Sequence, residues 1–461
     1  MSYDIMFDIT FSGRRARYLD ISDAIAAALR DGTLRDGDRL PTHREVADRT
    51  GVSLATVTKG YAEAQRLGLL QAVPGRGTFV TALGTSAVQK RRKPGTVRDL
   101  SSHLIPIAPD DAGLAEAMRR AVSRLGGFGA FSAVPALGTD EDRAAGAAWL
   151  RRVGEVAEAA EVAVCGGSQH ALLVVIASLT RPGEAIGTEA LTDPSFRMVA
   201  ALSDRRLLPL PATGWQLDTD RLEDFVRGQD LRMLVVTPNL ANPTNATMDL
   251  AGRQALVRAA RACDAVIVES DLYGPLLEDR LPSIRSLAPE RTLFVSSLSK
   301  VVGPGAKVAY VAGPKELLER LAAGIRMSVG MTTPLIPAVA TELISSGSID
   351  RIVGLQREEC ARRAAMADRH FGRFGAALHP RSWHAWVPLP DAWTPDTFVA
   401  ASSVIGIRLA ESGAFNVGRG GQPGAVRVCL GGDFGLSELE EACRRLADLA
   451  GGRPPPVALR A

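Results

Sequence analysis

A serine and a lysine three residues apart stand at the end of a predicted strand near the middle of the chain. Residues 292–297 form a short apolar segment, and Ser297-Leu298-Ser299-Lys300 closes it. A lysine held by such a strand can form an imine with the aldehyde of pyridoxal phosphate (PLP), while the serine hydroxyl holds a phosphate oxygen. The pattern therefore predicts a PLP site on Lys300.

Further candidates for this site follow other predicted strands and turns. Gly167-Ser168-Gln169 is a glycine-rich turn that opens a helix, and the N–H groups of such a turn can bind a phosphate. Asn242 and Tyr273 each follow a predicted strand, where they could bond the hydroxyl oxygen of the pyridine ring. Arg427 could pair with the carboxylate of a bound amino acid. Taken singly, Asn242 is equally a turn residue, Tyr273 a core residue and Arg427 a surface strand residue.

Alternating helical and apolar segments indicate the architecture that positions these residues. Short strands are predicted at residues 185–189, 233–237, 265–269, 293–297 and 308–312, with helical patterns between them. Such alternation predicts a parallel sheet with helices on both faces. The 461-residue chain is too long for one ordinary core. Domains are expected at residues 12–81 and 100–461, joined at 82–99 by a linker that contains a run of four basic residues.

The N-terminal pattern differs from the rest of the chain and predicts a winged helix-turn-helix. Apolar residues recur at helical spacing over residues 18–30. Thr42 is expected to cap a helix over 43–49, and Ser53 a second helix over 54–67. Two short strands, predicted at residues 69–72 and 78–81, form a hairpin around a glycine-rich turn.

In a helix-turn-helix, the second helix enters the major groove of DNA by its N-terminal residues. Leu54 or a threonine methyl group could contact a thymine methyl group, while threonine hydroxyls could reach base edges or phosphates. Arg44 and Arg76 are candidates for phosphate or minor-groove contacts, or else ordinary surface charges. The complete set of predicted DNA contacts is Arg44, Ser53, Leu54, Thr56, Thr58, Lys59, Arg76, Gly77 and Thr78.

Composition and charge agree with a DNA-binding end on a globular body. The chain is 46% hydrophobic and 23% charged, which excludes a disordered protein. Its net charge is +3, but residues 1–95 hold 15 basic and 10 acidic residues, so this part carries +5 and the rest −2. With no apolar run long enough to span a bilayer and no signal-peptide pattern, a cytoplasmic protein is expected. The five cysteines show no metal-ligand spacing, so free thiols and no metal site are expected.

Residues 15–80 resemble the GntR family of winged-helix regulators. The similarity lies in three motifs: residues 39–47 (Arg-Leu-Pro-Thr-His-Arg-Glu-Val-Ala), residues 51–61 (Gly-Val-Ser-Leu-Ala-Thr-Val-Thr-Lys-Gly-Tyr) and residues 75–80 (Gly-Arg-Gly-Thr-Phe-Val). The family often has an arginine where this chain has Leu54, so the family's base contacts are not carried over.

Residues 100–461 resemble the fold-type I aminotransferases, and the two-domain arrangement resembles the MocR subfamily of GntR-type regulators. The resemblance implies an α/β fold, PLP on Lys300, and phosphate contacts from Ser168, Gln169, Ser297 and Lys307. It also implies a head-to-tail homodimer.

The chain departs from the aminotransferase pattern at three cofactor positions. Ser270 stands three residues before Tyr273, where the family has the aspartate that bonds the pyridine nitrogen, and Asp271 comes one residue late. Asp193 replaces a stacked aromatic residue, which predicts the loss of that contact, and Lys307 replaces a phosphate-binding arginine. Without a carboxylate at its nitrogen the pyridine ring is a poor electron sink, but imine exchange does not need that sink. A backbone shift that lets the Asp271 carboxylate reach the pyridine nitrogen would restore the ring as an electron sink.

These observations predict a transcriptional regulator rather than an enzyme. It would bind double-stranded DNA and sense an amine or amino acid through imine exchange at Lys300. Two alternatives stay open: an active aminotransferase with an accessory DNA-binding domain, and a regulator whose large domain has lost PLP.

Overall fold

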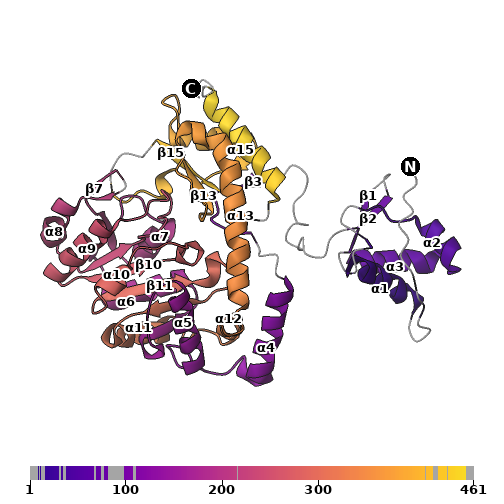
Figure 1. The fold of residues 1–461 in the computed structure, drawn as a ribbon, viewed down its shortest axis with the longest axis horizontal. Helices are drawn as coiled ribbons and strands as arrows, with labels where there is room; N and C mark the ends of the chain where they lie inside the picture. Colours follow the sequence, from indigo (N-terminus) through magenta and orange to yellow (C-terminus); the bar gives the residue numbers. More distant parts are fainter. Residues whose placement is uncertain are drawn as a thin grey trace. The chain divides into compact units, whose positions relative to one another are not determined.

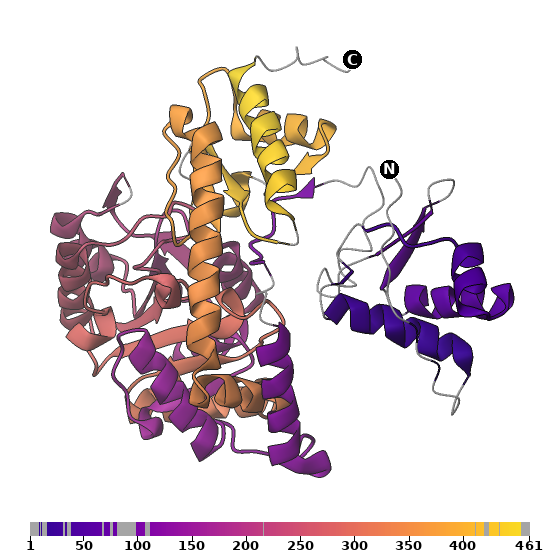
Figure 2. The same cartoon turned by 45° about the vertical axis from the view of Figure 1, so that its right-hand side comes forward.

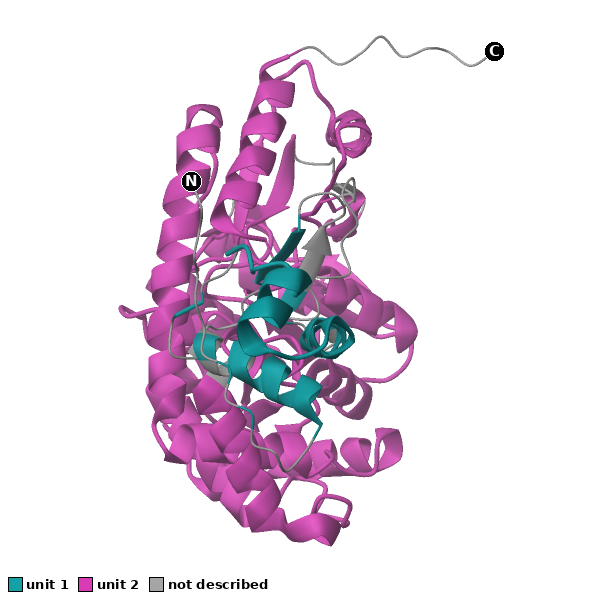
Figure 3. Cartoon of the chain, turned by 90° about the vertical axis from the view of Figure 1, so that its right-hand side faces the viewer, with its two compact units in different colours: residues 1–96 teal, residues 97–461 magenta. Residues whose placement is uncertain are grey.

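The computed structural model divides into two compact units, residues 1–96 and residues 97–461 (Figure 3). The structure describes residues 9, 11, 16–30, 33–34, 38–66, 69–73, 77–80, 98–106, 111–214, 216–410, 412–418, 424–432 and 434–452. Most of the expected linker therefore lies outside the described residues. Among the described helices, none combines the length and the apolar composition needed to cross a membrane.

The first unit has three helices and a two-stranded hairpin, as the sequence predicts. The helices are α1 (Arg17–Arg30), α2 (His43–Thr50) and α3 (Leu54–Arg66), and the antiparallel strands are β1 (Leu70–Val73) and β2 (Gly77–Val80). Ile21, Val57 and Tyr61 are buried between them. Gly60 lets α1 approach α3 closely, because a Cβ atom at this position would lie 2.8 Å from Cβ of Ile21.

Side-chain caps fix the turn between α2 and α3. The Thr42 hydroxyl accepts a hydrogen bond from the Glu45 backbone N–H at 3.3 Å, and the Glu45 carboxylate accepts one from the Thr42 N–H at 2.6 Å. Gly51 ends α2 with φ 67°, a left-handed conformation that favours glycine. Ser53 then accepts from the Thr56 N–H at 3.2 Å at the start of α3. Both predicted caps, Thr42 and Ser53, are confirmed.

The second unit is built on a seven-stranded sheet. The strand order is β4 (Val162–Cys165), β12 (Ala309–Ala312), β11 (Thr292–Ser297), β10 (Val266–Ser270), β9 (Met233–Val236), β5 (Ala185–Thr188) and β6 (Arg206–Pro209). All neighbours are parallel except β12, which is antiparallel to both β11 and β4. The prediction of a purely parallel sheet was wrong at β12. Only a short loop joins β11 to β12, and such a connection cannot carry the crossover that a parallel pair requires.

Helices cover both faces of this sheet, as predicted (Figure 1). Alternate residues of β12 enter different cores: Val311 packs with α6 (Ser168–Leu179) and α11 (Lys315–Ser328), whereas Tyr310 packs with α5 (Asp140–Arg152). Strands buried on both faces explain the continuous apolar runs in the sequence. The remaining elements around the sheet are α4 (Asp111–Gly129), α7 (Pro194–Leu202), α8 (Thr219–Gly228), α9 (Leu250–Ala262), α10 (Ile284–Leu287), α12 (Leu335–Ser345) and the short strands β7 (Ala212–Thr213) and β8 (Gln216–Leu217).

A smaller layer completes the second unit. The long helix α13 (Ser348–Phe371) leads into it, and the layer contains α14 (Pro395–Val404), α15 (Leu436–Gly451) and the antiparallel pair β13 (His384–Pro388) and β15 (Ala425–Cys429) (Figure 2). Strand β3 (Arg98–Asp99) pairs in parallel with β14 (Ile407–Arg408), so the first described residues of this unit are tied to its C-terminal part.

Candidate functional site

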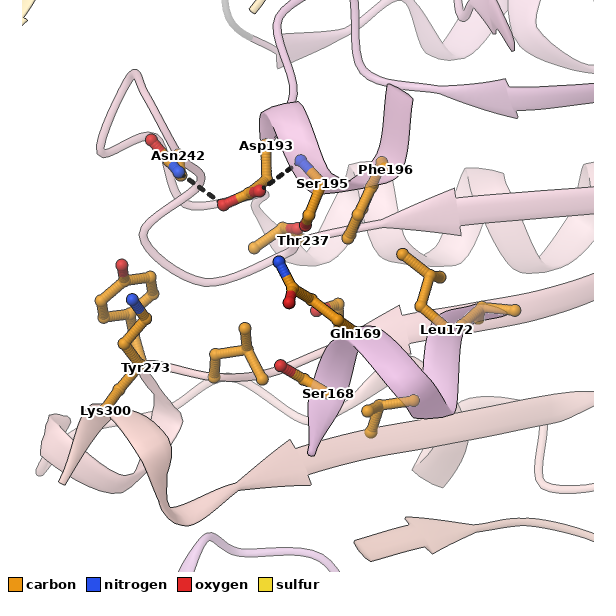
Figure 4. A pocket seen from close by; sticks show the side chains of 14 residues that line it. Ser168, Gln169, Leu172, Asp193, Ser195, Phe196, Thr237, Asn242, Tyr273 and Lys300 are labelled. Atoms are coloured by element: carbon orange, nitrogen blue, oxygen red, sulfur yellow. Dashed lines mark hydrogen bonds between the residues drawn. The ribbon is translucent and has the colours of Figure 1, made fainter. Parts of the chain in front are cut away.

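A cavity that is partly open to solvent lies among β10, β11, α6 and α7 of the second unit. Figure 4 shows Lys300 and Tyr273 at one end of it and Ser168 and Gln169 at the start of α6. Its wall consists of Ser168, Gln169, Leu172, Asp193, Ser195, Phe196, Thr237, Asn242, Val268, Ser270, Leu272, Tyr273, Val295 and Lys300. Six residues predicted for the PLP site, Ser168, Gln169, Asn242, Ser270, Tyr273 and Lys300, are thus brought together.

Lys300 supplies an amine with unusual acidity. A short 3-10 turn, Leu298–Lys300, follows β11 and carries the side chain to the cavity. Burial lowers the pKa of Lys300 to about 8, although the nearby Asp193 carboxylate acts in the opposite direction. Its Nζ donates a hydrogen bond to the His103 carbonyl oxygen at 2.5 Å. At pH 7 about one tenth of the amine is therefore unprotonated, the form that nucleophilic attack on an aldehyde requires.

The N-terminus of α6 is a glycine turn with the features of an anion site. Gly167 precedes the helix with φ 93°, and a Cβ atom on it would lie 3.3 Å from Cδ of Lys307. The Lys307 side chain therefore runs across the turn, adding a positive charge to a helix N-terminus that already attracts anions. Ser168 and Gln169 offer polar side chains beside it. These groups fit the phosphate of PLP.

Ser297 takes a different place from the one its spacing predicts. Its hydroxyl donates to the Val308 carbonyl oxygen at 2.9 Å and accepts from the Ser299 N–H at 3.2 Å. The side chain is fully buried between β11 and β12 and does not line the cavity. It stabilises the turn that delivers Lys300.

Asn242, Asp193 and Arg427 form a connected polar chain. The Asn242 amide donates to Asp193 Oδ2 at 2.6 Å, and its oxygen accepts from Arg427 Nη1 at 2.9 Å. Arg427, on β15, is only 4% exposed and lies over the Phe415 ring at 4.7 Å. It is therefore not a surface strand residue. Asp193 and Arg427 border a second, more open cavity, which adjoins the first through Gln169, Asp193 and Ser195.

The end of β10 separates Ser270 from Asp271. Ser270 lines the cavity, while Asp271 Oδ1 accepts from Asn239 Nδ2 at 3.2 Å and from the Gly274 N–H at 2.9 Å. Successive residues of a strand point to opposite faces, which accounts for the difference. Burial raises the pKa of Asp271, and the Arg280 guanidinium opposes that rise. The structure does not bring Asp271 into the cavity.

Three rings in or beside the cavity were not predicted. Phe196 lines it one helical turn after Asp193, so the cavity wall has an aromatic ring near the position where Asp193 replaces the family's stacked residue. The His103 ring stacks on Tyr273, whose hydroxyl lies 2.7 Å from His103 Nδ1, and His384 Nδ1 lies 3.3 Å from His103 Nε2. Burial lowers the pKa of both histidines well below the ordinary value. The spacing of Phe196, three residues after Asp193, could have indicated from the sequence that its ring lies at the cavity. His103 and His384 stand in no motif, so the sequence carries no such indication for them.

In the first unit, the predicted DNA contacts lie at the start of α3, on α2 and on β2. Leu54, Thr58, Lys59 and Arg44 are exposed. The Ser53 and Thr56 hydroxyls lie 2.8 Å apart and can bond each other. Gly77 and Thr78 belong to β2, and Arg76 lies outside the described residues. Arg39 lies against Gly77, because a Cβ atom there would be 2.9 Å from Arg39 Nε.

Comparison with known families decides what kind of protein this is. Residues 108–446 match the aminotransferase class I and II family, and residues 17–80 match the gntR family of bacterial regulatory proteins. The chain belongs to the aminotransferase class I and II family, and its residues 17–80 form a gntR-type domain. It has the MocR-type architecture and is a transcriptional regulator of that type, with an aminotransferase-like domain.

Individual relatives agree with this architecture. The chain is 25% identical over 439 residues to the uncharacterized HTH-type transcriptional regulator YdeF of Bacillus subtilis, covering 94% of each chain. It is 28% identical over 357 residues to the pyridoxine biosynthesis regulator PdxR of Corynebacterium glutamicum, covering 76% of this chain and 77% of the relative. A solved structure of the α-aminoadipate aminotransferase LysN from Thermus thermophilus matches with a TM-score of 0.69, 24% identity, 85% of this chain and 98% of that chain. The predicted fold class is confirmed.

Proposed function

We propose that this MocR-type regulator carries PLP on Lys300 and senses a small amine or amino acid by imine exchange at that lysine. The observation that carries the proposal is the Lys300 amine, whose pKa is lowered to about 8, in one cavity with the anion-binding turn of α6. When bound, PLP supplies an aldehyde that condenses with amines and a ring that can withdraw electrons.

Polar groups in and beside the cavity have separate roles in this proposal. The Gly167 turn, Ser168, Gln169 and Lys307 would hold the phosphate. Asn242 and Tyr273 would bond the ring hydroxyl oxygen. Arg427 would bind the carboxylate of an amino acid in the adjoining cavity, because a guanidinium can make two parallel hydrogen bonds to a carboxylate.

Ser270 favours sensing over turnover. Of the described residues that line the cavity, Asp193 alone has a carboxylate, and that group bonds Asn242 and the Ser195 N–H. A serine cannot hold a proton on a pyridine nitrogen as a carboxylate can, so stabilisation of a carbanion would be weak. Exchange of one amine for another needs no carbanion. We therefore infer that the aminotransferase-like domain binds ligands without efficient transamination.

A second candidate for the sensed molecule is PLP itself. PdxR is named as a regulator of pyridoxine biosynthesis. The relative PtsJ of Salmonella typhimurium, 24% identical over 410 residues, is named as a repressor of the vitamin B6 salvage pathway. The same cavity and the same lysine would serve this role, with cofactor binding as the signal.

The proposal also includes a homodimer that acts on DNA in the cytoplasm. Phe128, Phe131 and Met327 are 92%, 89% and 87% exposed in the described chain. A second subunit that covers these side chains would remove their apolar surface from water. A head-to-tail pairing follows from the resemblance to aminotransferases, and a cytoplasmic location follows from the need to reach the chromosome.

The pH dependence of PLP attachment tests the role assigned to Lys300. Only the neutral amine attacks an aldehyde, and the neutral fraction rises about tenfold per pH unit below the pKa. With a pKa of about 8, the rate of attachment to the cofactor-free protein should rise from pH 6 to 8 and then level off. Stopped-flow absorbance with excess PLP measures this rate. A rate that keeps rising to pH 10 would show an ordinary, solvated lysine.

Salt dependence tests the DNA-binding role of α3. Replacing Lys59 with alanine should weaken binding to the region upstream of the protein's own gene. It should also flatten the slope of log affinity against log salt by about one unit, since one phosphate contact is lost. Lys315→Ala is a matched control, because Lys315 is an exposed helical lysine of the second unit. Equal slopes for the wild type and Lys59→Ala would contradict the assignment.

A further inference from the structure

Residues 98–106, here called the tether, are the first described residues of the second unit and connect by chain to the DNA-binding unit. Backbone hydrogen bonds fix its start: the Arg98 N–H donates to the Gly406 carbonyl at 2.8 Å, and the Leu100 N–H donates to the Arg408 carbonyl at 2.9 Å. At its end, the Pro106 carbonyl accepts from Gln356 Nε2 at 3.1 Å. The tether is thus part of the fold and not a loose extension.

The middle of the tether is held by the functional groups of the candidate site. The Ser101 carbonyl oxygen accepts from Arg427 Nη2 at 2.5 Å, and the His103 carbonyl oxygen accepts from Lys300 Nζ at 2.5 Å. The His103 ring lies on Tyr273 and within hydrogen-bond distance of its hydroxyl. Three site residues therefore bond the same short segment.

Each of these three groups is also needed by a ligand in the proposed function. Condensation of Lys300 with an aldehyde removes both hydrogens of the neutral amine as water and forms a C=N bond. The nitrogen then keeps no N–H for the His103 carbonyl unless it takes up a further proton. The Tyr273 hydroxyl is required at the ring oxygen, and Arg427 at the carboxylate of an amino acid. The tether and the ligands compete for the same hydrogen bonds.

We propose that His103 is a positioning residue that competes with PLP for Lys300 and Tyr273, so that ligand binding releases the tether. The proposal rests on the proposed function, since it takes Lys300 as the PLP attachment site. PLP would displace the contacts of His103, and the carboxylate of an amino acid would displace Ser101 from Arg427. Because the chain runs from the tether into the DNA-binding unit, this release gives the site a covalent route to the winged helix.

The sign of a mutational effect distinguishes competition from a merely structural role. Replacing His103 with alanine removes the ring that contacts Tyr273 but keeps the backbone carbonyl that bonds Lys300. It should tighten PLP binding by about two- to tenfold, the worth of the one hydrogen bond to Tyr273 that PLP no longer has to displace. Titration of the cofactor-free, full-length protein with PLP, followed by visible absorbance, measures this affinity. Leu104→Ala is the matched control, because the Leu104 side chain is exposed and lies in the same segment. Unchanged or weaker binding in His103→Ala would overturn the proposal.

Hydrogen exchange supplies a second readout on the unmutated protein. Addition of PLP should speed exchange of the amides in residues 98–106, while inorganic phosphate should not. A visible band with unchanged or slower exchange in residues 98–106 would show that PLP binds without displacing the tether, which refutes the proposed competition between His103 and PLP. That result leaves the proposed PLP site on Lys300 intact. If PLP gives no visible band at all, the proposed function itself fails, and the competition falls with it.

Discussion

Replacing Lys300 with alanine is expected to abolish the visible absorbance of the protein with PLP and its fixation by borohydride. Lys300 is the amine at the end of β11, and its pKa of about 8 lets it act as a nucleophile near neutral pH. Among the described residues that line the cavity, only Lys300 has an amine to which PLP could attach. The absorbance spectrum of the purified variant after incubation with PLP and gel filtration measures the effect.

The variant Lys307→Ala distinguishes the covalent attachment of PLP to Lys300 from the binding of the PLP phosphate. Lys307 runs across the Gly167 turn, and its removal deletes one positive charge near the proposed phosphate. This variant should bind PLP more weakly but still show the visible band at high PLP concentration. A visible band that persists unchanged in Lys300→Ala would place the cofactor on another lysine.

Replacing Ser270 with aspartate is expected to accelerate conversion of bound PLP to its pyridoxamine form by tenfold or more. A carboxylate at this position of β10 would face the cavity and favour a protonated pyridine nitrogen, which makes the ring a better electron sink. A tenfold gain corresponds to about 1.4 kcal/mol in the activation free energy. Single-turnover absorbance measurements with one responsive amino acid compare the wild type with the variant.

Asp271→Asn is the control for this experiment. Asp271 accepts hydrogen bonds from Asn239 and the Gly274 N–H outside the cavity, so its charge should not affect the ring nitrogen. The single-turnover rate should therefore change little, while the protein should lose some stability because Arg280 loses its nearby counter-charge. Rapid conversion in the wild type that is lost in Asp271→Asn would show that Asp271 serves the cofactor and that the domain is an enzyme.

Local patterns predicted much of the fold and part of the site. The caps at Thr42 and Ser53, the winged helix and the strand before Lys300 all depend on neighbouring residues, and the structure agrees with them. The direction of β12 was not predicted, because pairing depends on the connection and not on the apolar run. Sequence spacing also placed Ser297 near the phosphate, but its hydroxyl instead bonds Val308.

Long-range contacts explain what the sequence could not show. His103, Tyr273 and His384 come from three distant parts of the chain, and only the folded structure brings their rings together. Ser270 and Asp271 are adjacent in sequence, yet the alternation of a strand puts one in the cavity and the other outside it. Phe196 reaches the cavity wall because one helical turn separates it from Asp193.

Occupancy of Lys300 by PLP is expected to control how tightly the protein binds DNA. The affinity of the full-length protein for the region upstream of its own gene is measured by fluorescence anisotropy at fixed salt, with and without PLP. In the wild type, PLP should change this affinity by about fivefold or more, as expected for allosteric coupling. In Lys300→Ala, PLP should leave it unchanged. Equal affinities with and without PLP in the wild type, or the same response in Lys300→Ala, would contradict the account.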